Sequence, residues 1–255
     1  MQYMPIDPDT LAQFFHSCNI DEFAIVPISD MTAPPCRAPA DLFPASRTMI
    51  VFGKVMPDDL FKGSVAETTA KFSAFKQELT CTSNKLVRLL EQSGFTAAGV
   101  TSVRVKDGKI RGSLSLKHCA REAGLGEIGE NGLLLSPRFG IRLGLGAVLT
   151  DHEIPAVIPN KNPVTVCTHC GMCIKACPTN ALFNGGMIQS RCLNITGAIP
   201  APLVSFFFRL LRIKPLEPLM AVIVNGIATR STPRCSACLV ACPLFKRYAG
   251  GNSDT

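Results

Sequence analysis

The stretch CTHCGMCIKACP, residues 167–178, decides the fold of the second half of this 255-residue chain. Its cysteines follow the spacing Cys-x2-Cys-x2-Cys-x3-Cys-Pro. In a run of this kind three thiolates hold one 4Fe-4S cluster, and the fourth reaches a neighbouring cluster. The two-residue gaps fold the backbone around the first cluster, while the longer gap begins a helix that directs the last thiolate away. The sequence therefore predicts two clusters, which need further cysteines to complete them.

A second cysteine group, at Cys192, Cys235, Cys238 and Cys242-Pro243, supplies the missing ligands. Aligning its Cys-Pro with the first Cys-Pro makes Cys242 the ligand that crosses between clusters. The first local ligand is then absent, and Cys192 replaces it from 43 positions upstream of Cys235 (235 − 192). We expect one cluster on Cys167, Cys170, Cys173 and Cys242, and the other on Cys177, Cys192, Cys235 and Cys238.

The sequence favours other roles for the cysteines, and for the histidine between them, less strongly. A pair of four-thiolate zinc sites uses the same ligands, but gaps of two, two and three before proline favour crossed cluster ligation. We expect His169 to form hydrogen bonds near a cluster and not to bind metal. The remaining cysteines stand singly, and we expect them to be buried as small apolar residues. They are Cys18, Cys36, Cys81 and Cys119.

Composition and charge limit the class of protein. The 47% hydrophobic content supports a folded core, and neither an apolar run of membrane-spanning length nor a signal-peptide pattern is present. We therefore expect a cytoplasmic protein, in whose reducing surroundings twelve cysteines indicate metal. Residues 1–100 carry a formal charge of 8 − 11 = −3, and the remainder carries 18 − 8 = +10. Because two anionic clusters would offset much of that positive charge, the balance does not favour nucleic acid as a partner.

Strands and helices alternate before the cysteines, which predicts an α+β chain with two domains. The Pro/Asn-rich stretch 154–163 separates an α/β domain over residues 1–155 from a cysteine-organised domain over residues 160–255. Hydrophobic periodicity predicts helices over residues 8–18, 66–92 and 115–123. It predicts strands over residues 23–28, 48–52, 97–105, 133–135 and 141–150.

A glycine-dense stretch, Gly124-x-Gly126-x2-Gly129, formally fits a dinucleotide-binding fingerprint. That fingerprint needs a strand before it and a helix after it, whereas the order here is reversed. Two alternatives remain open at this point. The glycines either form a tight connection that needs positive φ, or bring bare backbone close to a large flat cofactor.

The stretch SLKHCAREAGLGEIGENGLLLSPRFGIRLGLGAVLTD, residues 115–151, together with the cysteine groups that follow, resembles the epoxyqueuosine reductase and reductive dehalogenase superfamily. The resemblance implies a nitroreductase-like, corrinoid-binding domain followed by a two-cluster, ferredoxin-like domain. It implies an iron-sulfur oxidoreductase that passes low-potential electrons, from a donor such as reduced ferredoxin or flavodoxin, to a corrinoid or substrate. It also implies that a cobalamin site would be lined by Gly124, Gly126, Gly129, Asn131 and Gly132.

The chain departs from this superfamily where a proton donor is expected. The position of the acidic donor of epoxyqueuosine reductases is occupied by Ile110, and the tyrosines, Tyr3 and Tyr248, lie at the two ends. The nearest replacements are Lys117, His118 and Glu122. The chain also stops soon after Cys242-Pro243, where those enzymes continue into helical repeats. A non-catalytic protein that transfers electrons, or handles a corrinoid for a partner enzyme, is therefore the alternative to an enzyme.

The stretch 199–229 between Cys192 and Cys235 has the character of an insertion. Its phenylalanines at 206–208 and its three cations, Arg209, Arg212 and Lys214, predict a short basic amphipathic helix interrupted by prolines. That helix is too short and too charged to span a bilayer. We expect the stretch 199–229 to pack against the core or to form a lid. A partner interface and contact with a membrane surface are the alternatives.

Overall fold

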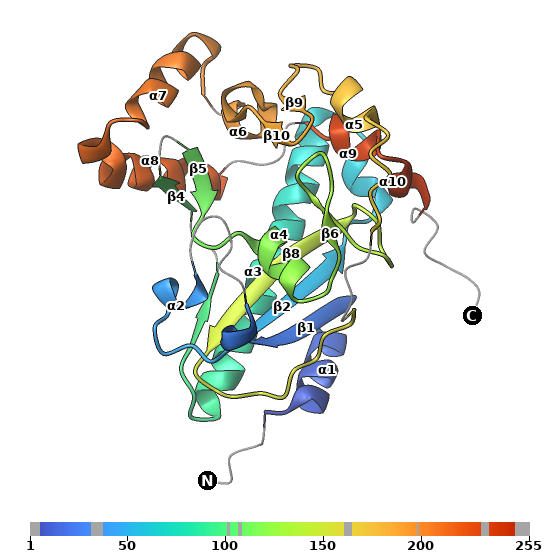
Figure 1. Cartoon of the computed structure of the whole chain (residues 1–255), viewed down its shortest axis with the longest axis vertical. Helices are drawn as coiled ribbons and strands as arrows, with labels where there is room; N and C mark the ends of the chain where they lie inside the picture. The colour runs from blue at the N-terminus through green and yellow to red at the C-terminus, as the bar shows by residue number, and fades with distance from the viewer. Residues whose placement is uncertain are drawn as a thin grey trace.

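The computed structural model describes residues 6–31, 38–100, 103–106, 109–160, 165–197, 199–230 and 235–247. Its centre is a four-stranded antiparallel sheet with the strand order β1-β2-β8-β3 (Figure 1). The mixture of helices and strands agrees with the predicted α+β class. The strands are β1 (Glu22–Pro27), β2 (Thr48–Val55), β3 (Ala97–Gly99) and β8 (Leu143–Thr150).

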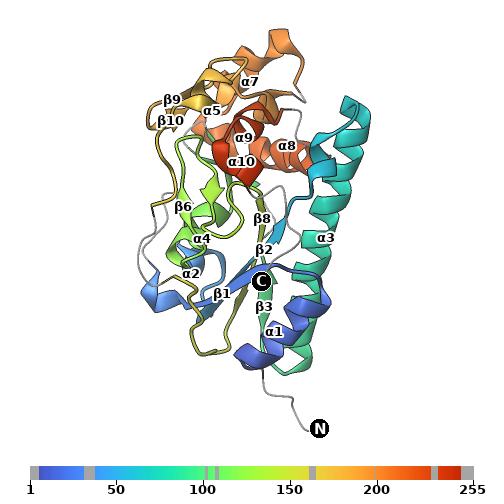
Figure 2. The same ribbon diagram turned by 90° about the vertical axis from the view of Figure 1, so that its right-hand side faces the viewer.

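Both faces of this sheet are buried, which explains why its strands read as almost continuous apolar runs. Successive side chains of a strand point to opposite faces. In β2, Ile50 and Phe52 therefore pack against α1 (Pro8–Ser17) and α3 (Val65–Gln92). Met49 and Val51 of the same strand pack against α4 (Leu116–Glu122) on the other face. Figure 2 shows this layering, with α3 and α4 on opposite sides of the sheet.

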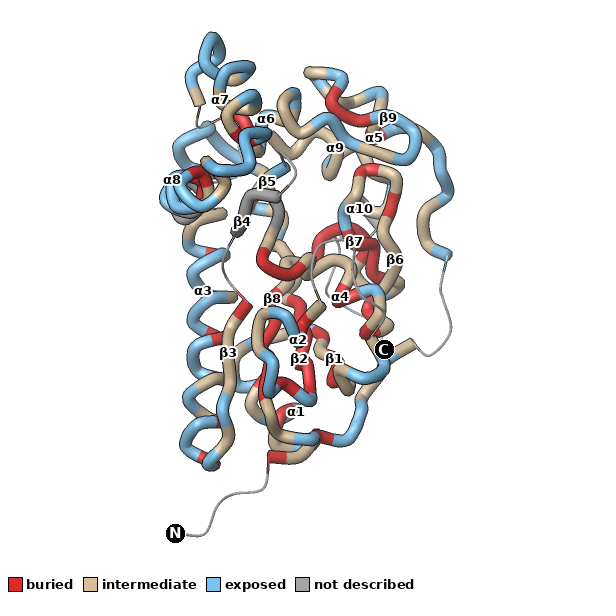
Figure 3. The backbone as a smooth tube through the Cα atoms, turned by 60° about the vertical axis from the view of Figure 1, so that its left-hand side comes forward, coloured by how far each residue is buried: buried red, intermediate tan, exposed pale blue. Residues whose placement is uncertain are grey.

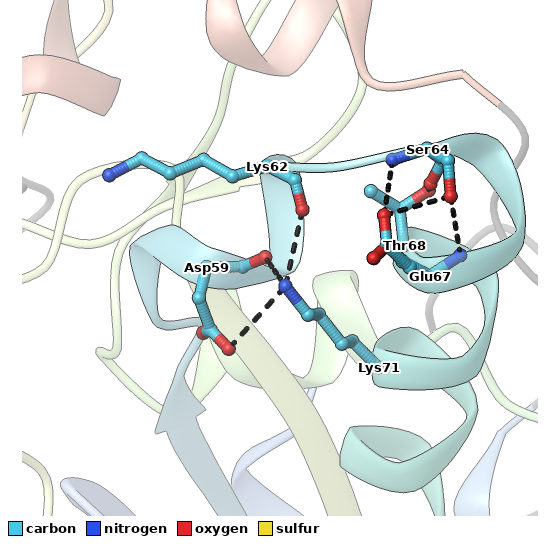
Figure 4. A network of polar contacts seen from close by, with 6 residues as sticks. All are labelled: Asp59, Lys62, Ser64, Glu67, Thr68 and Lys71. Carbon is cyan, nitrogen blue, oxygen red and sulfur yellow. Dashed lines mark hydrogen bonds and ion pairs between the residues drawn. The ribbon is translucent and has the colours of Figure 1, made fainter.

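The long helix α3 begins at a capping box, which fixes its start one residue before the position expected from periodicity. Ser64 Oγ accepts a hydrogen bond from the Glu67 backbone N–H at 3.3 Å. The Glu67 carboxylate accepts one from the Ser64 backbone N–H at 2.7 Å. One turn later, Lys71 Nζ donates to the backbone oxygens of Asp59 and Lys62, so the cap is tied to the preceding loop (Figure 4).

The expected strand over 97–105 is wrong as one element. Its first part joins the sheet as β3, and its second part forms a separate ribbon of β4 (Val103–Lys106) with β5 (Lys109–Gly112). The glycine-dense stretch follows α4 as β6 (Glu127–Ile128), a tight turn, and β7 (Leu134–Leu135). Short elements near the first strands are η1 (Ile28–Asp30), α2 (Pro39–Leu42) and η2 (Asp58–Phe61).

The cysteine-bearing half lies at one end of the sheet, in the orange-to-red part of Figure 1. It is built from short elements joined by loops. Phe245 docks its last helix on the first half, with its ring 4.9 Å from that of Phe61 and 5.0 Å from the Arg142 guanidinium. The elements are α5 (Met172–Lys175), β9 (Leu182–Phe183), β10 (Gly186–Met187), η3 (Gln189–Arg191), α6 (Leu193–Thr196), η4 (Ala201–Leu203), α7 (Val204–Leu210), η5 (Lys214–Leu216), α8 (Glu217–Arg230), α9 (Ala237–Val240) and α10 (Pro243–Arg247).

The stretch 199–229 differs in part from its expected form. The short helix around the phenylalanines is present as α7, but a second helix, α8, continues from Glu217 through Pro218. Proline is compatible with the first turn of a helix, which explains why it does not interrupt this one. No helix in the described part of the chain is long and apolar enough to cross a membrane.

Candidate metal and cofactor site

Four cysteines surround a small cavity of about 60 Å³ where the two halves meet. The loop before α5 contributes Cys167 and Cys170, α5 itself contributes Cys173, and Cys242 comes from the residue before α10. These are the four cysteines that the spacing assigns to one cluster. Cys242 reaches them because α10 packs on the first half through Phe245, beside Leu135 and Ile141.

The other four cysteines line a larger cavity of about 680 Å³. Cys177 follows α5 and Cys192 follows η3, while Cys235 lies two residues before α9 and Cys238 lies in its first turn. These are the four that the spacing assigns to the second cluster, brought together from segments more than 40 positions apart (235 − 192 = 43). Among the described residues, no three His, Cys, Asp or Glu side chains converge closely enough to hold a single metal ion.

The thiols in these two sets oppose one another's ionisation. Burial, followed by the charges of Cys235 and Cys192, raises the pKa of the Cys238 thiol to about 11. Burial also raises the pKa values of Cys173 and Cys242. At Cys177, burial acts upward, but hydrogen bonds from the backbone N–H groups of nearby residues outweigh it and lower the pKa. Because cysteine binds metal as the thiolate, binding of a metal centre to either set would be coupled to release of the thiol protons.

Three side-chain clamps position the cysteine segments. The Glu127 carboxylate accepts hydrogen bonds from the backbone N–H groups of Val166 and Cys167. Asn194 forms a reciprocal pair with the backbone of Cys235, donating at 2.7 Å and accepting at 2.8 Å. Gln189 forms the same kind of pair with the backbone of Ile110, at 2.8 and 3.0 Å. The first and third clamps join the first half of the chain to the cysteine-bearing half.

Glu130 lies between the two sets of cysteines, because it lines both cavities. Its Oε2 atom is buried and has no hydrogen-bond partner among the described residues. Sequence reasoning missed Glu127, Glu130 and Asn194. The signal for the first two was the presence of two acidic residues in a stretch otherwise made of glycine, apolar residues and one asparagine.

The glycine-dense stretch plays two roles. Gly129, Asn131 and Gly132 line the larger cavity, whereas Gly124 and Gly126 are not part of its lining. Gly124 has φ +75° and Gly126 has φ +152°. A side chain on Gly124 would meet the Asn160 backbone oxygen, and one on Gly126 would meet that of Leu135. Gly124 and Gly126 therefore form a tight connection that needs positive φ, as the first alternative expects. Gly129, Asn131 and Gly132 border the cavity.

Of the three candidate catalytic side chains, Lys117 alone is in the lining of the larger cavity. Its Nζ donates to the Gly132 backbone oxygen at 2.6 Å, which holds the glycine turn against α4. His118 Nδ1 lies 2.6 Å from Ser115 Oγ at the start of α4. Glu122 pairs with the neighbouring Arg121 at 2.7 Å. The latter two side chains therefore make local contacts of the helix.

The single cysteines differ in how far they are buried. Cys119 is buried as expected, Cys18 is half-buried, and the expectation is wrong for Cys81, which is exposed because it faces outward from α3. Cys36 and both tyrosines lie outside the described residues. His169, with φ +50°, lines the larger cavity beside the cysteines.

Residues 164–183 match the family model described as a 4Fe-4S binding domain. Among curated proteins, an epoxyqueuosine reductase of Listeria monocytogenes serovar 1/2a is 30% identical over 163 residues, which are 61% of this chain and 41% of that protein. The epoxyqueuosine reductase structure from Streptococcus thermophilus has a TM-score of 0.57 at 18% identity. It covers 93% of this chain and 65% of that one. This chain thus spans less than two thirds of the length of these relatives.

A second solved structure, of epoxyqueuosine reductase with an epoxyqueuosine-modified tRNA stem loop, has a TM-score of 0.53 at 17% identity. It also covers 93% of this chain and 65% of that one. That protein binds a tRNA stem loop, whereas charge leads us to expect that nucleic acid is not a partner of this chain.

Proposed function

We propose that this chain, which is similar to epoxyqueuosine reductases in sequence and fold, is an iron-sulfur reductase with two 4Fe-4S clusters. One cluster would be bound by Cys167, Cys170, Cys173 and Cys242, and the other by Cys177, Cys192, Cys235 and Cys238. The observation that carries the proposal is that each of two adjoining cavities is lined by one of these sets.

The clusters would relay electrons toward the larger cavity. The second set of cysteines lines that cavity together with Gly129, Asn131 and Gly132 from the first half. Electrons that enter at the first set would pass the second set before they reach this glycine turn. We accordingly propose the division into a nitroreductase-like domain over residues 1–155 and a ferredoxin-like domain over residues 160–255.

The larger cavity is suited to a corrinoid. Its volume of about 680 Å³ would be shared between the second cluster, at the cysteines, and the corrinoid, at the glycine turn, where bare backbone and apolar side chains form the wall. A bound corrinoid would supply a cobalt centre that accepts electrons singly and reacts with substrate. Gly129 and Gly132 would let it approach the backbone, and Asn131 would border it. Gly124 and Gly126 would not contact the corrinoid, but they would shape the turn that does.

Lys117 is the candidate proton donor in this proposal. Its Nζ is at the cavity wall and is held by the Gly132 backbone oxygen, so a proton on this atom is available to a bound molecule. A reductive bond cleavage needs a proton at the departing group, which a positioned side chain supplies efficiently. His118 and Glu122 would serve by stabilising α4, which carries Lys117.

The second candidate function is non-catalytic transfer of electrons, or corrinoid handling, for a partner enzyme. It is favoured because two of the three candidate catalytic side chains, His118 and Glu122, are not in the cavity lining, and because Ile110 occupies the superfamily's acidic position. In either function, a reduced ferredoxin or flavodoxin is the proposed electron donor.

Anaerobic purification with hydroxocobalamin present, followed by iron, sulfide, zinc and cobalt analysis, tests the proposal. We expect about eight irons per chain, as two 4Fe-4S clusters require, and an equivalent of bound corrinoid. Zinc in place of iron would contradict the cluster assignment. Iron without corrinoid would leave an electron relay and remove the proposed use of the larger cavity.

Lys117→Ala and His118→Ala separate the two functions. In a reductase, we expect Lys117→Ala to lower turnover of an epoxyqueuosine-containing tRNA stem loop by about 100-fold or more. His118→Ala is expected to change turnover little. Clusters that reduce normally while both variants and wild type fail to convert any substrate would favour the non-catalytic function.

A further inference from the structure

The outer side of α8 exposes a stripe of large apolar side chains. Leu219, Val222 and Ile223 are 58%, 71% and 42% exposed. Their spacing of three and four positions places them on one side of the helix. On the opposite side, Met220 and Val224 are buried against α7 and Ile110. Figure 3 shows how little of α7 and α8 is buried compared with the sheet.

This helix is therefore apolar on both its inner and its outer sides. Residues 218–229 contain no charged residue. A helix that is apolar all round is normally covered on every side, either by protein or by lipid. Contiguous apolar patches of this kind on a monomer mark a surface where something binds.

The segment before α8 carries positive charge. Arg209, Arg212 and Lys214 are exposed, and Phe206 among them is 57% exposed. Phe207 and Phe208 pack α7 into the same cluster as the buried side of α8, so the cations and the apolar stripe belong to one unit. Between residues 199 and 229, the acidic residue is Glu217 alone.

We propose that α7 and α8 form an interfacial patch that binds the surface of an anionic lipid bilayer. Apolar side chains beside Lys and Arg are the pattern of a helix that lies in the headgroup region. The 14 residues of α8 are too few to span the bilayer, which is consistent with a position along its surface. This inference does not depend on the proposed reductase function.

Charge complementarity selects this occupant over two others. An isologous contact between two copies of the chain would bring Arg209, Arg212 and Lys214 of both copies together, with Glu217 as the acidic counterpart on each. RNA would satisfy the cations but would leave the stripe at Leu219, Val222 and Ile223 in water. Anionic lipid satisfies the cations and covers the stripe at the same time.

Vesicle flotation of the full, cluster-loaded chain tests the proposal. We expect binding to vesicles that contain phosphatidylglycerol, weakened by high salt, and little binding to phosphatidylcholine alone. Each cation near an anionic surface contributes about fivefold in affinity, so Arg209→Gln with Arg212→Gln is expected to cost about 25-fold. The control pair, Lys85→Gln with Arg88→Gln, removes the same charge from the exposed side of α3 and should bind as wild type does.

The apolar contribution has its own variants. Leu219→Gln with Val222→Gln should reduce binding about 10-fold or more, whereas Val65→Gln, at a valine that is 73% exposed at the start of α3, should not. Iron content identical to wild type would establish that these variants fold. Absence of binding to anionic vesicles would overturn the proposal. So would a concentration-dependent dimer that the α8 variants abolish, or RNA binding that only the arginine pair removes.

Discussion

The carboxylate of Glu127 accepts a hydrogen bond from the backbone N–H of Cys167, 40 positions further along the chain (167 − 127). The same carboxylate oxygen accepts the N–H of Val166. A residue of the glycine-dense stretch thus fixes the loop that carries the first cysteine of the cluster motif. The two halves of the chain are coupled at the point where the smaller cavity forms.

Removal of this carboxylate should loosen the loop. We expect Glu127→Ala to lower the free energy of unfolding by about 3 kcal/mol, because two backbone donors lose a charged acceptor. Denaturant unfolding of the anaerobically purified protein measures this loss. Glu153→Ala removes an exposed carboxylate paired with Arg47, and should change the free energy by less than about 1 kcal/mol. Equal effects of the two changes would contradict a role for Glu127 in holding the loop.

The crossed assignment predicts which cluster each cysteine variant loses. Cys192→Ala should remove a ligand of the second cluster only, so that iron falls from about eight to about four per chain. Electron paramagnetic resonance of the reduced protein should then show one cluster without spin coupling to another. Cys81→Ala, at an exposed cysteine on α3, should keep the full iron content. Complete retention of iron by Cys192→Ala would contradict the assignment.

We expect alanine substitutions at Gly126, in the glycine turn, and at Gly226, on α8, to change the free energy of unfolding in opposite directions. Gly126→Ala places a methyl group against the Leu135 backbone oxygen at φ +152°, and should cost about 2–4 kcal/mol of unfolding free energy. Gly226→Ala on α8 meets nothing within 4 Å, and should stabilise the helix by up to about 1 kcal/mol. Thermal or denaturant unfolding measures both. A neutral Gly126→Ala would show that the turn relaxes without cost.

The burial of Glu22 leads us to expect that the stability of the fold depends on pH. Burial raises its carboxyl pKa above the ordinary value of 4.5, although the Arg138 guanidinium and Ser136 Oγ, at 4.0 and 3.3 Å, act in the opposite direction. A raised pKa in the folded state means that its contribution to stability is complete below pH 4.5 and is lost as pH rises through the raised value.

Glu22→Gln should therefore be more stable than wild type at pH 7, with the difference vanishing as pH falls below about 4. Glu67→Gln should show the opposite sign, because hydrogen bonds from Ser64 lower the Glu67 pKa. Its carboxylate stabilises the fold above the ordinary pKa, and that contribution is lost as pH falls. Unfolding free energies at pH 4 and pH 7 measure both differences. A Glu22→Gln protein less stable than wild type at pH 7 would show that the Arg138 contact outweighs burial.

Local patterns in the sequence were sufficient for the long elements, and they predict two sets of cysteines that line separate cavities in the structure. The 28-residue helix α3 and the strand β8 follow from periodicity, because each has a face that packs on the core. The division into two sets of four follows from cysteine spacing, because ligands of one cluster must be close in the chain or aligned with a matching motif. The same alignment predicts that Cys192 joins the second set across a long insertion. In the structure, Cys192 lines the same cavity as the other three cysteines of that set.

The sequence by itself was sufficient for the long helices and the main sheet strands, and it carries the cysteine spacing and the resemblance, since these depend on short-range patterns. Tertiary structure decided what surrounds them. Whether Gly126 lines a cavity or packs against Leu135, and whether α8 is covered, depends on segments that are distant in the chain. The same holds for Glu127 and Glu130, whose positions beside the cysteines arise only when the two halves pack together. Spacing encodes which ligands can share a metal centre, whereas the burial and partners of a side chain are properties of the whole packed molecule.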